Sequence, residues 1–87
     1  MQHESHPDIV KRLKRCEGHL RKTIEMIEEG RPCADLAQQL HAVQKAIEQA
    51  KKTLIHDHID HCLTGSAHGA GDAEALVAEF REISKYL

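Results

Sequence analysis

The apolar residues in the first third of the chain recur at steps of three and four, the periodicity of one face of an α-helix. The members of this repeat are Ile9, Leu13, Cys16, Leu20, Ile24 and Ile27. Ser5 and Pro7 mark a helix start, where the serine hydroxyl is placed to cap free backbone N–H groups. Gly30 and the following Pro32 favour the end of the helix. The pattern predicts a helix over residues 6–29.

A second apolar repeat continues without a helix breaker. Its members are Leu36, Leu40, Val43, Ile47, Ala50 and Leu54. It predicts a helix over residues 33–63, a rod about 45 Å long. One small chain cannot cover such a rod, so we expect it to pack against other copies of the same chain. After a glycine-rich break at 64–71, the spacing of Leu76, Phe80, Ile83 and Leu87 predicts a third helix over residues 72–86.

The composition is typical of long helices rather than of a compact core. The 87 residues include one Phe, one Tyr and no Trp, and the chain shows no strand-like alternation. We therefore expect one all-α domain over residues 1–87, with a long central helix and with its stability dependent on partner chains. No run approaches the roughly 20 apolar residues of a membrane span. Residues 1–8 lack a signal-peptide core, so we expect a cytoplasmic protein.

Metal-binding side chains lie at both ends of the long predicted helix. His58 and Cys62 are four residues apart and share one face near its end, whereas Cys33 lies at its start. One helix cannot bring its own ends together, but two antiparallel copies place Cys33 of one chain beside His58 and Cys62 of the other. Three cysteines in a reducing compartment suit metal binding or thiol chemistry better than disulfides. The spacing predicts an intersubunit site of two thiolates and one imidazole.

Simpler interpretations of these residues stay open at this point. Cys62 can be a buried core residue that is four positions from His58 by chance, and Cys33 can likewise serve packing alone. His56 and His61 lie off the apolar repeat and are expected to be solvated. Cys16 lies on the first repeat and is expected to be structural. No oxyanion loop, substrate-binding aromatic residue or cleft is evident, so we expect no enzymatic activity.

Basic residues gather in the first predicted helix, although the net charge is −2. They are Lys11, Arg12, Lys14, Arg15, Arg21 and Lys22, with only Glu17 among them. They largely avoid the apolar repeat, so an ordinary solvated surface is one interpretation. Repeated in an oligomer, the same face forms an extended positive surface that fits DNA phosphates. No helix-turn-helix or zinc-finger pattern is present, so DNA binding would rest on shape and backbone contacts.

Three segments, RLKRCEGHLR, RPCADLAQQLHAVQKAI and HDHIDHCL, resemble the CsoR/RcnR family of bacterial metal-responsive repressors over about residues 8–63. The resemblance implies a disc-like tetramer, a dimer of antiparallel dimers, that binds double-stranded operator DNA in the apo state. An inducer would release the DNA and derepress an efflux or detoxification operon. By this resemblance Cys33, His58 and Cys62 match the core metal ligands. Basic residues that match the DNA-binding patch are Arg12, Lys14 and Arg15, with Lys45, Lys51 and Lys52 as weaker candidates.

The resemblance leaves the inducer open. Copper sensors commonly have Tyr before the first Cys, where this chain has Pro32. Nickel and cobalt members recruit an N-terminal His, for which His3 and His6 are the candidates. Two thiolates and one imidazole suit three-coordinate copper(I), and a fourth nitrogen suits square-planar nickel(II). We place nickel or cobalt ahead of copper, with no organic cofactor.

Two other functions remain as alternatives. Other members of the family sense persulfide or formaldehyde, so the chain could be a thiol-based sensor that acts through Cys33. A helical interaction module that is stapled by zinc and does not bind DNA is the alternative from a different class.

Overall fold

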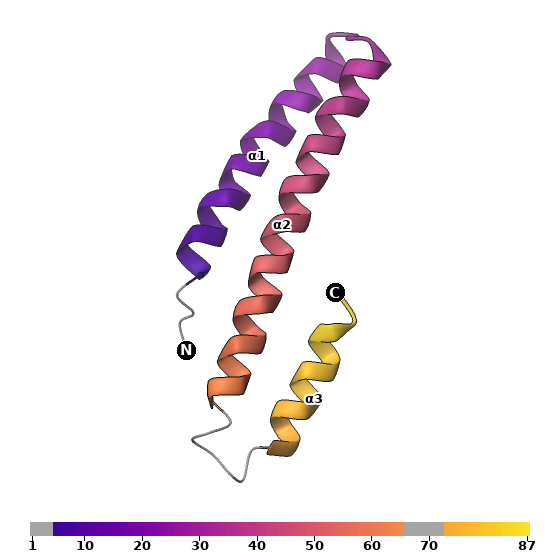
Figure 1. Cartoon of the computed structure of the whole chain (residues 1–87). Helices are drawn as coiled ribbons and strands as arrows, with labels where there is room; N and C mark the ends of the chain where they lie inside the picture. The colour runs from indigo at the N-terminus through magenta and orange to yellow at the C-terminus, as the bar shows by residue number, and fades with distance from the viewer. Residues whose placement is uncertain (1–4, 66–72) are drawn as a thin grey trace.

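A hairpin of two long antiparallel helices forms the body of the protein (Figure 1). The computed structural model describes the backbone of residues 5–65 and 73–87 and the side chains of 5–60 and 73–87. Helix α1 spans His6–Glu28, α2 spans Cys33–Gly65 and α3 spans Ala73–Ser84. The described residues contain no strand. An all-α chain of three helices with a long central helix is therefore confirmed.

The ends of α1 follow from the residues that flank it. Ser5 occupies the N-cap position, but its hydroxyl makes no capping hydrogen bond, so the expected side-chain cap is wrong. At the other end, Gly30 has a φ of 75°, a left-handed conformation that glycine adopts without strain. The Gly30 N–H donates to the carbonyl of Ile27 (3.0 Å), and the Arg31 N–H donates to that of Met26 (3.1 Å). This pair of bonds is the Schellman motif, and it turns the chain into α2.

Only a few of the described side chains of α1 and α2 are fully buried. The buried apolar residues of these two helices are Ile9, Cys16 and Met26 on α1 and Val43, Ala50 and Ile55 on α2. Thr23 is fully buried, and its hydroxyl donates to the carbonyl of His19 at 2.9 Å. His19 Nε2 also lies 2.6 Å from Gln39 Oε1, a hydrogen bond that joins the two helices. This bond fixes their register.

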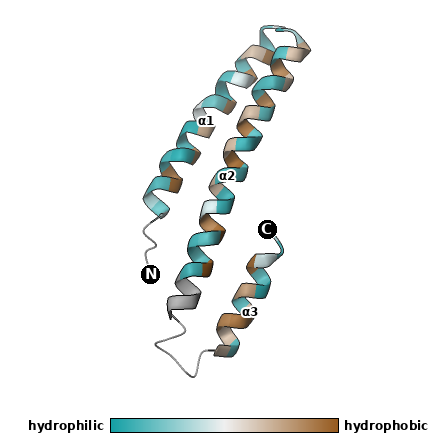
Figure 2. Cartoon of the chain, viewed as in Figure 1, coloured by the Kyte–Doolittle hydropathy of each residue, from teal (hydrophilic) through white to brown (hydrophobic). Residues whose placement is uncertain are grey.

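Each apolar repeat divides into two helix faces. Leu13, Leu20, Ile24 and Ile27 on α1, and Leu40, Ile47 and Leu54 on α2, are 39–50% exposed. Part of each repeat therefore does not meet the neighbouring helix of the same chain. A repeat at steps of three and four is wide enough to cover two adjacent faces, of which one meets the neighbouring helix and one does not. Figure 2 shows the hydrophobic positions spread along both helices.

The shape of the chain leaves the second face of each repeat uncovered. The chain measures 58 × 23 × 13 Å and has a radius of gyration of 17.8 Å, against about 12 Å for a compact domain of this length. Helix α3 lies along the end of α2 on the side away from α1 and contacts α2 alone (Figure 1). Its Val77 and Phe80 are also exposed. No helix in the described part of the chain is long and apolar enough to cross a membrane.

Candidate metal site and DNA-binding surface

Cys33 and His58 lie on one face of α2, at its opposite ends. They are 25 residues apart, which places them about 37 Å apart along the helix and about 20° apart around its axis. Leu40, Ile47 and Leu54 lie between them on the same face, and all three are exposed. We call this face, from Cys33 to His58, the ligand seam. It is an apolar strip with a metal-binding side chain at each end.

Cys33 is accessible because of its place in the helix. Backbone N–H groups of Asp35 and Leu36 donate to the Pro32 carbonyl at 3.0 and 3.1 Å, so α2 begins directly after this proline. Cys33 is the first residue of α2, and its thiol is free and exposed. A free thiol at a helix end can be captured by a soft metal ion without disturbing the core.

His58 lies at the other end of the seam, beside α3. Its side chain is 19% exposed, and its Nε2 lies 3.8 Å from the carboxylate of Glu79. This distance is longer than a hydrogen bond. A carboxylate near a metal-binding imidazole is nevertheless a common means of orienting the ring. The structure thus adds a residue of α3 to the surroundings of His58.

Of the remaining proposed ligands, the structure describes the side chain of His6 alone. Cys62 belongs to α2, but its side chain lies outside the described side chains, and His3 lies outside the described residues. His6 is the first residue of α1 and is half-buried. Because α1 and α2 are antiparallel, His6 lies at the same end of the hairpin as His58 (Figure 1). An N-terminal imidazole is therefore near the His58 end of the seam, not the Cys33 end.

A single chain does not assemble a metal site from the residues that the structure describes. Among them, no three His, Cys, Asp or Glu side chains are grouped so that they could hold a metal ion. The length of α2 explains this, because it separates Cys33 from His58. The donor set itself, thiol and imidazole, fits copper(I), nickel(II), cobalt(II) or zinc.

The basic residues of α1 spread over a wide part of the helix surface. All of them are exposed. Lys11, Arg15 and Lys22 share one face, since they follow each other at steps of four and seven. Lys14 and Arg21 lie about 100–120° around the helix from Arg15. The predicted basic patch therefore covers a broad part of the α1 surface.

A groove between α1 and α2 opens beside Arg15. Its volume is about 240 Å³, and its lining residues are Arg12, Arg15, Cys16 and His19 of α1 and Ala46 and Gln49 of α2. The lining includes no carboxylate. Arg12 Nε also donates to the carboxylate of Asp8 at 3.1 Å, in an exposed pair one helical turn apart. We call this feature the interhelical groove, and its charge favours an anionic ligand.

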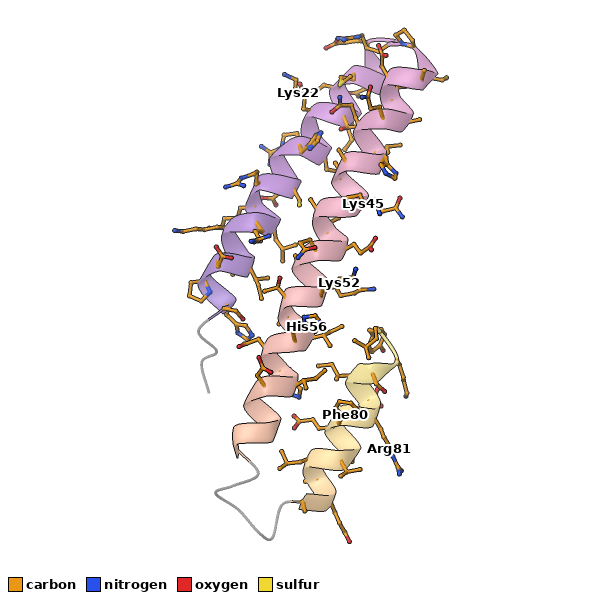
Figure 3. All side chains as sticks on the ribbon, viewed as in Figure 1. Lys22, Lys45, Lys52, His56, Phe80 and Arg81 are labelled. Carbon is orange, nitrogen blue, oxygen red and sulfur yellow. The ribbon has the colours of Figure 1, made fainter. Side chains whose placement is uncertain are left out.

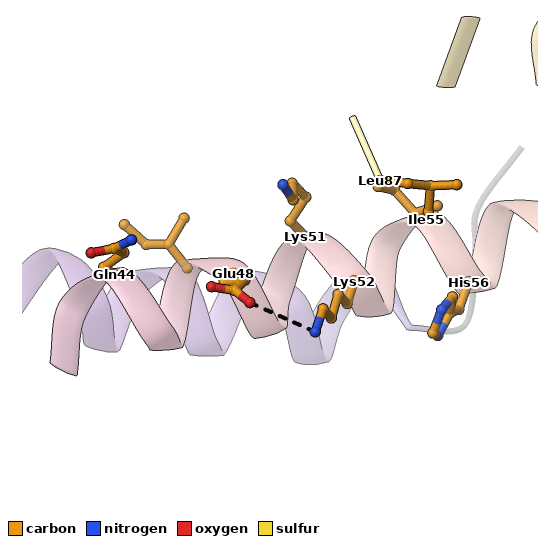
Figure 4. A pocket seen from close by; sticks show the side chains of 8 residues that line it. Gln44, Glu48, Lys51, Lys52, Ile55, His56 and Leu87 are labelled. Carbon is orange, nitrogen blue, oxygen red and sulfur yellow. Dashed lines mark ion pairs between the residues drawn. The ribbon is translucent and has the colours of Figure 1, made fainter. Parts of the chain in front are cut away.

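Lys51 and Lys52 are neighbours in the sequence but lie on different sides of α2. Lys51 lies on the side of Ile55 and the C-terminal Leu87, whereas Lys52 and His56 point to the other side (Figure 4). The groove next to Leu87 has a volume of about 590 Å³. Both lysines line this groove, Lys51 from the side on which Leu87 lies.

Lys45 and Lys52 lie on the side of α2 that faces away from α1 (Figure 3). They are seven residues apart and therefore share a face, and Lys52 lines the groove next to Leu87. Lys52 Nζ lies 3.6 Å from the carboxylate of Glu48, in an exposed pair. Neither lysine lines the interhelical groove, so the positive charge there comes from Arg12 and Arg15 of α1.

Two residues near these sites were not predicted from the sequence, for different reasons. His19 follows Arg15 by four positions, so the helical spacing that groups the basic residues could have found it. Glu79 carries no such signal, because its approach to His58 depends on the packing of α3 against α2.

Comparisons with known proteins identify curated relatives of similar length. The chain matches the metal-sensitive transcriptional repressor family over residues 5–87. The copper-sensing transcriptional repressor CsoR of Bacillus subtilis is 38% identical over 77 residues, which cover 88% of this chain and 75% of CsoR. The copper-sensing transcriptional repressor RicR of Mycobacterium tuberculosis is 39% identical over 71 residues, which cover 80% of this chain and 74% of RicR.

Solved structures with the same fold include sensors of two metals. The nickel-responsive transcriptional regulator InrS has a TM-score of 0.84 and 32% identity, over 99% of this chain and 96% of the InrS chain. The copper-sensing repressor CsoR with Cu(I) from Geobacillus thermodenitrificans has a TM-score of 0.83 and 32% identity, over 99% of this chain and 88% of that chain. The resemblance seen in the sequence is confirmed, and the family is one of regulators rather than enzymes. The chain belongs to the family of metal-sensitive transcriptional repressors.

Proposed function

We propose that this metal-responsive repressor binds operator DNA in the apo state and releases it when a transition metal joins two subunits. The metal site consists of Cys33 of one subunit with His58 and Cys62 of its partner. The observation that carries this proposal is the ligand seam, an exposed apolar face with Cys33 at one end and His58 at the other. Two seams in antiparallel contact bring these ends together.

The exposed apolar residues support an oligomer. Full burial of a Leu or Ile side chain contributes about 1.5–3 kcal/mol, so covering half-exposed residues such as Leu40 and Ile47 contributes roughly half as much for each. Helix α1 also has exposed apolar residues, namely Leu13, Leu20 and Ile24. A partner chain must therefore cover apolar side chains of α1 as well as of α2. We infer an antiparallel dimer, and we propose that it assembles into a tetramer, as the family resemblance implies.

The position of the DNA-binding surface is compatible with this dimer. In each helix the exposed apolar residues lie on one side of the α1–α2 contact, and the residues that line the interhelical groove lie on the other. Dimerisation through the apolar side therefore leaves Arg12 and Arg15 free to meet DNA. A repressor of this kind works where the DNA is, so we place it in the cytoplasm and infer that it controls efflux or detoxification genes.

The chain itself supplies the route from the metal site to the DNA-binding surface. A bound metal ion supplies strong bonds to thiolate and imidazole donors of two chains. Cys33 and His58 lie at opposite ends of α2. A metal ion held by Cys33 of one chain and by His58 of the other would therefore connect the first turn of one α2 to the last turns of the partner's α2. Helix α1, which carries Arg15, is joined to α2 by the hydrogen bond between His19 and Gln39. We therefore expect α1 to move together with α2. A coupling free energy of about 1–3 kcal/mol between metal and DNA binding is typical of such a switch.

Nickel or cobalt is the inducer that we propose first. His6 lies at the His58 end of the hairpin, and His3 precedes it in the sequence. His6 can therefore supply a nitrogen ligand in addition to that of His58. A fourth nitrogen suits nickel(II). Copper(I) is the second candidate, because CsoR and RicR are copper-sensing repressors.

Release of DNA by metal tests this function directly. Fluorescence anisotropy would follow the apo-protein on a duplex from the promoter region of its own gene, under anaerobic conditions, as nickel(II) or copper(I) is added. We expect tight binding without metal and an affinity about 5- to 150-fold lower with nickel(II). In His3→Ala and His6→Ala variants, loss of the nickel response with the copper response intact would identify the further ligand.

The other outcomes of this titration decide against parts of the proposal. Release by copper(I) alone would contradict nickel and support the second candidate. Release by neither metal would contradict a metal inducer, and persulfide and formaldehyde would then be tested on Cys33.

A further inference from the structure

A hydrogen bond between two side chains joins α1 to α2 beside the interhelical groove. His19 Nε2 of α1 lies 2.6 Å from Gln39 Oε1 of α2. We propose that this bond transmits the capture of Cys33 by metal to the basic residues Arg12 and Arg15. His19 and Gln39 are then positioning residues of the switch, which act through their neighbours in the sequence. The inference rests on the proposed function and names the contact that couples its two sites.

The bond lies close to both of the sites that it would couple. On α2, Gln39 is six residues after Cys33, a rise of about 9 Å along the helix, whereas His58 is about 28 Å further on. On α1, His19 follows Arg15 by four residues, so the two side chains are neighbours on the helix surface. His19 and Arg15 also line the same groove. A shift of the first turns of α2 therefore reaches Arg15 through two side chains.

Much of the remaining contact between the two helices is apolar, as at Cys16 and Val43. Attraction between apolar side chains is non-directional, so such contacts tolerate a small sliding of one helix along the other. A hydrogen bond requires a defined distance and angle. Breaking it in a part-buried contact leaves polar atoms incompletely paired, which costs free energy. A shift of α2 is therefore passed to α1 more directly through His19 and Gln39 than through the apolar contacts.

The chemistry of the bond defines the variants that test it. The acceptor is the oxygen of the Gln39 amide, so Nε2 of the neutral His19 ring carries the proton and donates it. His19→Gln retains an N–H donor at about the same reach, whereas His19→Leu has no donor. Gln39→Leu removes the acceptor. When His19→Leu and Gln39→Leu are combined, apolar groups replace both partners and no polar group of the pair is left unpaired.

The experiment compares affinity for DNA with and without metal. Anisotropy on the promoter duplex gives the ratio of the two affinities, and competition with a chelator gives the affinity for nickel(II) or copper(I), whichever releases wild type. We expect the double variant to lower the ratio about 2- to 30-fold, the range in which contacts between two sites modulate their coupling. Its affinity for metal, and for DNA without metal, should stay close to that of wild type. His19→Gln should keep the wild-type ratio.

Val43→Ala is the matched control, because it weakens the same contact between helices without changing the hydrogen bond. Val43 is buried on α2, so its truncation should lower Tm and leave the ratio unchanged. Thermal unfolding followed by circular dichroism measures Tm for each variant. An equal loss of the ratio in Val43→Ala would overturn the inference, because lower stability would then account for the effect.

The other outcomes separate this inference from the proposed function. If metal does not release wild type from the duplex, the proposed function fails and the inference fails with it. If metal releases wild type and the folded double variant equally, the coupling through His19 and Gln39 is wrong and the proposed function stands. Weaker DNA binding by the metal-free double variant with an unchanged ratio would likewise contradict the coupling. Should the double variant not fold, His19→Leu and Gln39→Leu are tested singly, with the same expected loss of the ratio.

Discussion

A Cys33→Ala protein should bind its operator as tightly as wild type and keep it when metal is added. Cys33 is exposed at the first position of α2, so removal of its thiol should leave the helical hairpin intact. The same change removes one of the ligands that joins two subunits. The coupling between metal and DNA, about 5- to 150-fold in affinity, should therefore disappear. Anisotropy on the promoter duplex with and without metal measures this loss.

Cys16→Ala is the matched control for this prediction. Cys16 is buried between α1 and α2, so its replacement should lower the free energy of unfolding by roughly 1 kcal/mol while the metal response remains. A Cys33→Ala protein that folds but does not bind DNA at all would show that Cys33 is structural. A Cys33→Ala protein that still releases DNA on metal addition would contradict the metal site.

An Ile47→Glu protein should lose both its partner chain and most of its thermal stability. Ile47 is 46% exposed in the single chain and lies in the middle of the ligand seam. In the proposed dimer this position is covered, and an unpaired carboxylate buried there costs several kcal/mol. Light scattering after size-exclusion chromatography gives the mass of the assembly, and thermal unfolding followed by circular dichroism gives Tm.

Gln38→Glu provides the same change of charge away from the seam. Gln38 is exposed on α2, and substitutions at such positions usually change stability by less than about 0.5 kcal/mol. The two variants should therefore differ strongly in mass and in Tm. If Ile47→Glu behaves like Gln38→Glu, the apolar seam is not an interface.

The helices and their connection can be predicted from local sequence signals. Gly30 predicts the end of the first helix, and it adopts the left-handed conformation of a Schellman motif. The division of the apolar repeats cannot be predicted in the same way. Ile9 and Leu13 belong to one repeat, but Ile9 is buried and Leu13 is 43% exposed. Periodicity shows which positions are apolar, and only tertiary packing decides which of two adjacent apolar faces meets the neighbouring helix.

The residues of the candidate site, too, can be predicted only where local spacing places them. The placement of Cys33 and His58 on one face follows from helical spacing, and the structure presents them along an exposed seam. The approach of Glu79 to His58 cannot be predicted from spacing, because it depends on how α3 lies against α2. The contact between His19 and Gln39 depends equally on the register of α1 against α2.

Mixing two inactive variants tests the central claim, a metal site shared between subunits, most directly. Cys33→Ala and His58→Ala chains, each unable to form the site alone, would be unfolded together, refolded and titrated with metal while the thiolate-to-metal absorption is followed. In a two-fold dimer each mixed pair contains one intact site, so random mixing should restore about one quarter of the wild-type sites per chain. Recovery of that absorption, absent from either variant alone, is the result that the shared site predicts. No recovery in mixtures shown to contain mixed dimers would contradict it.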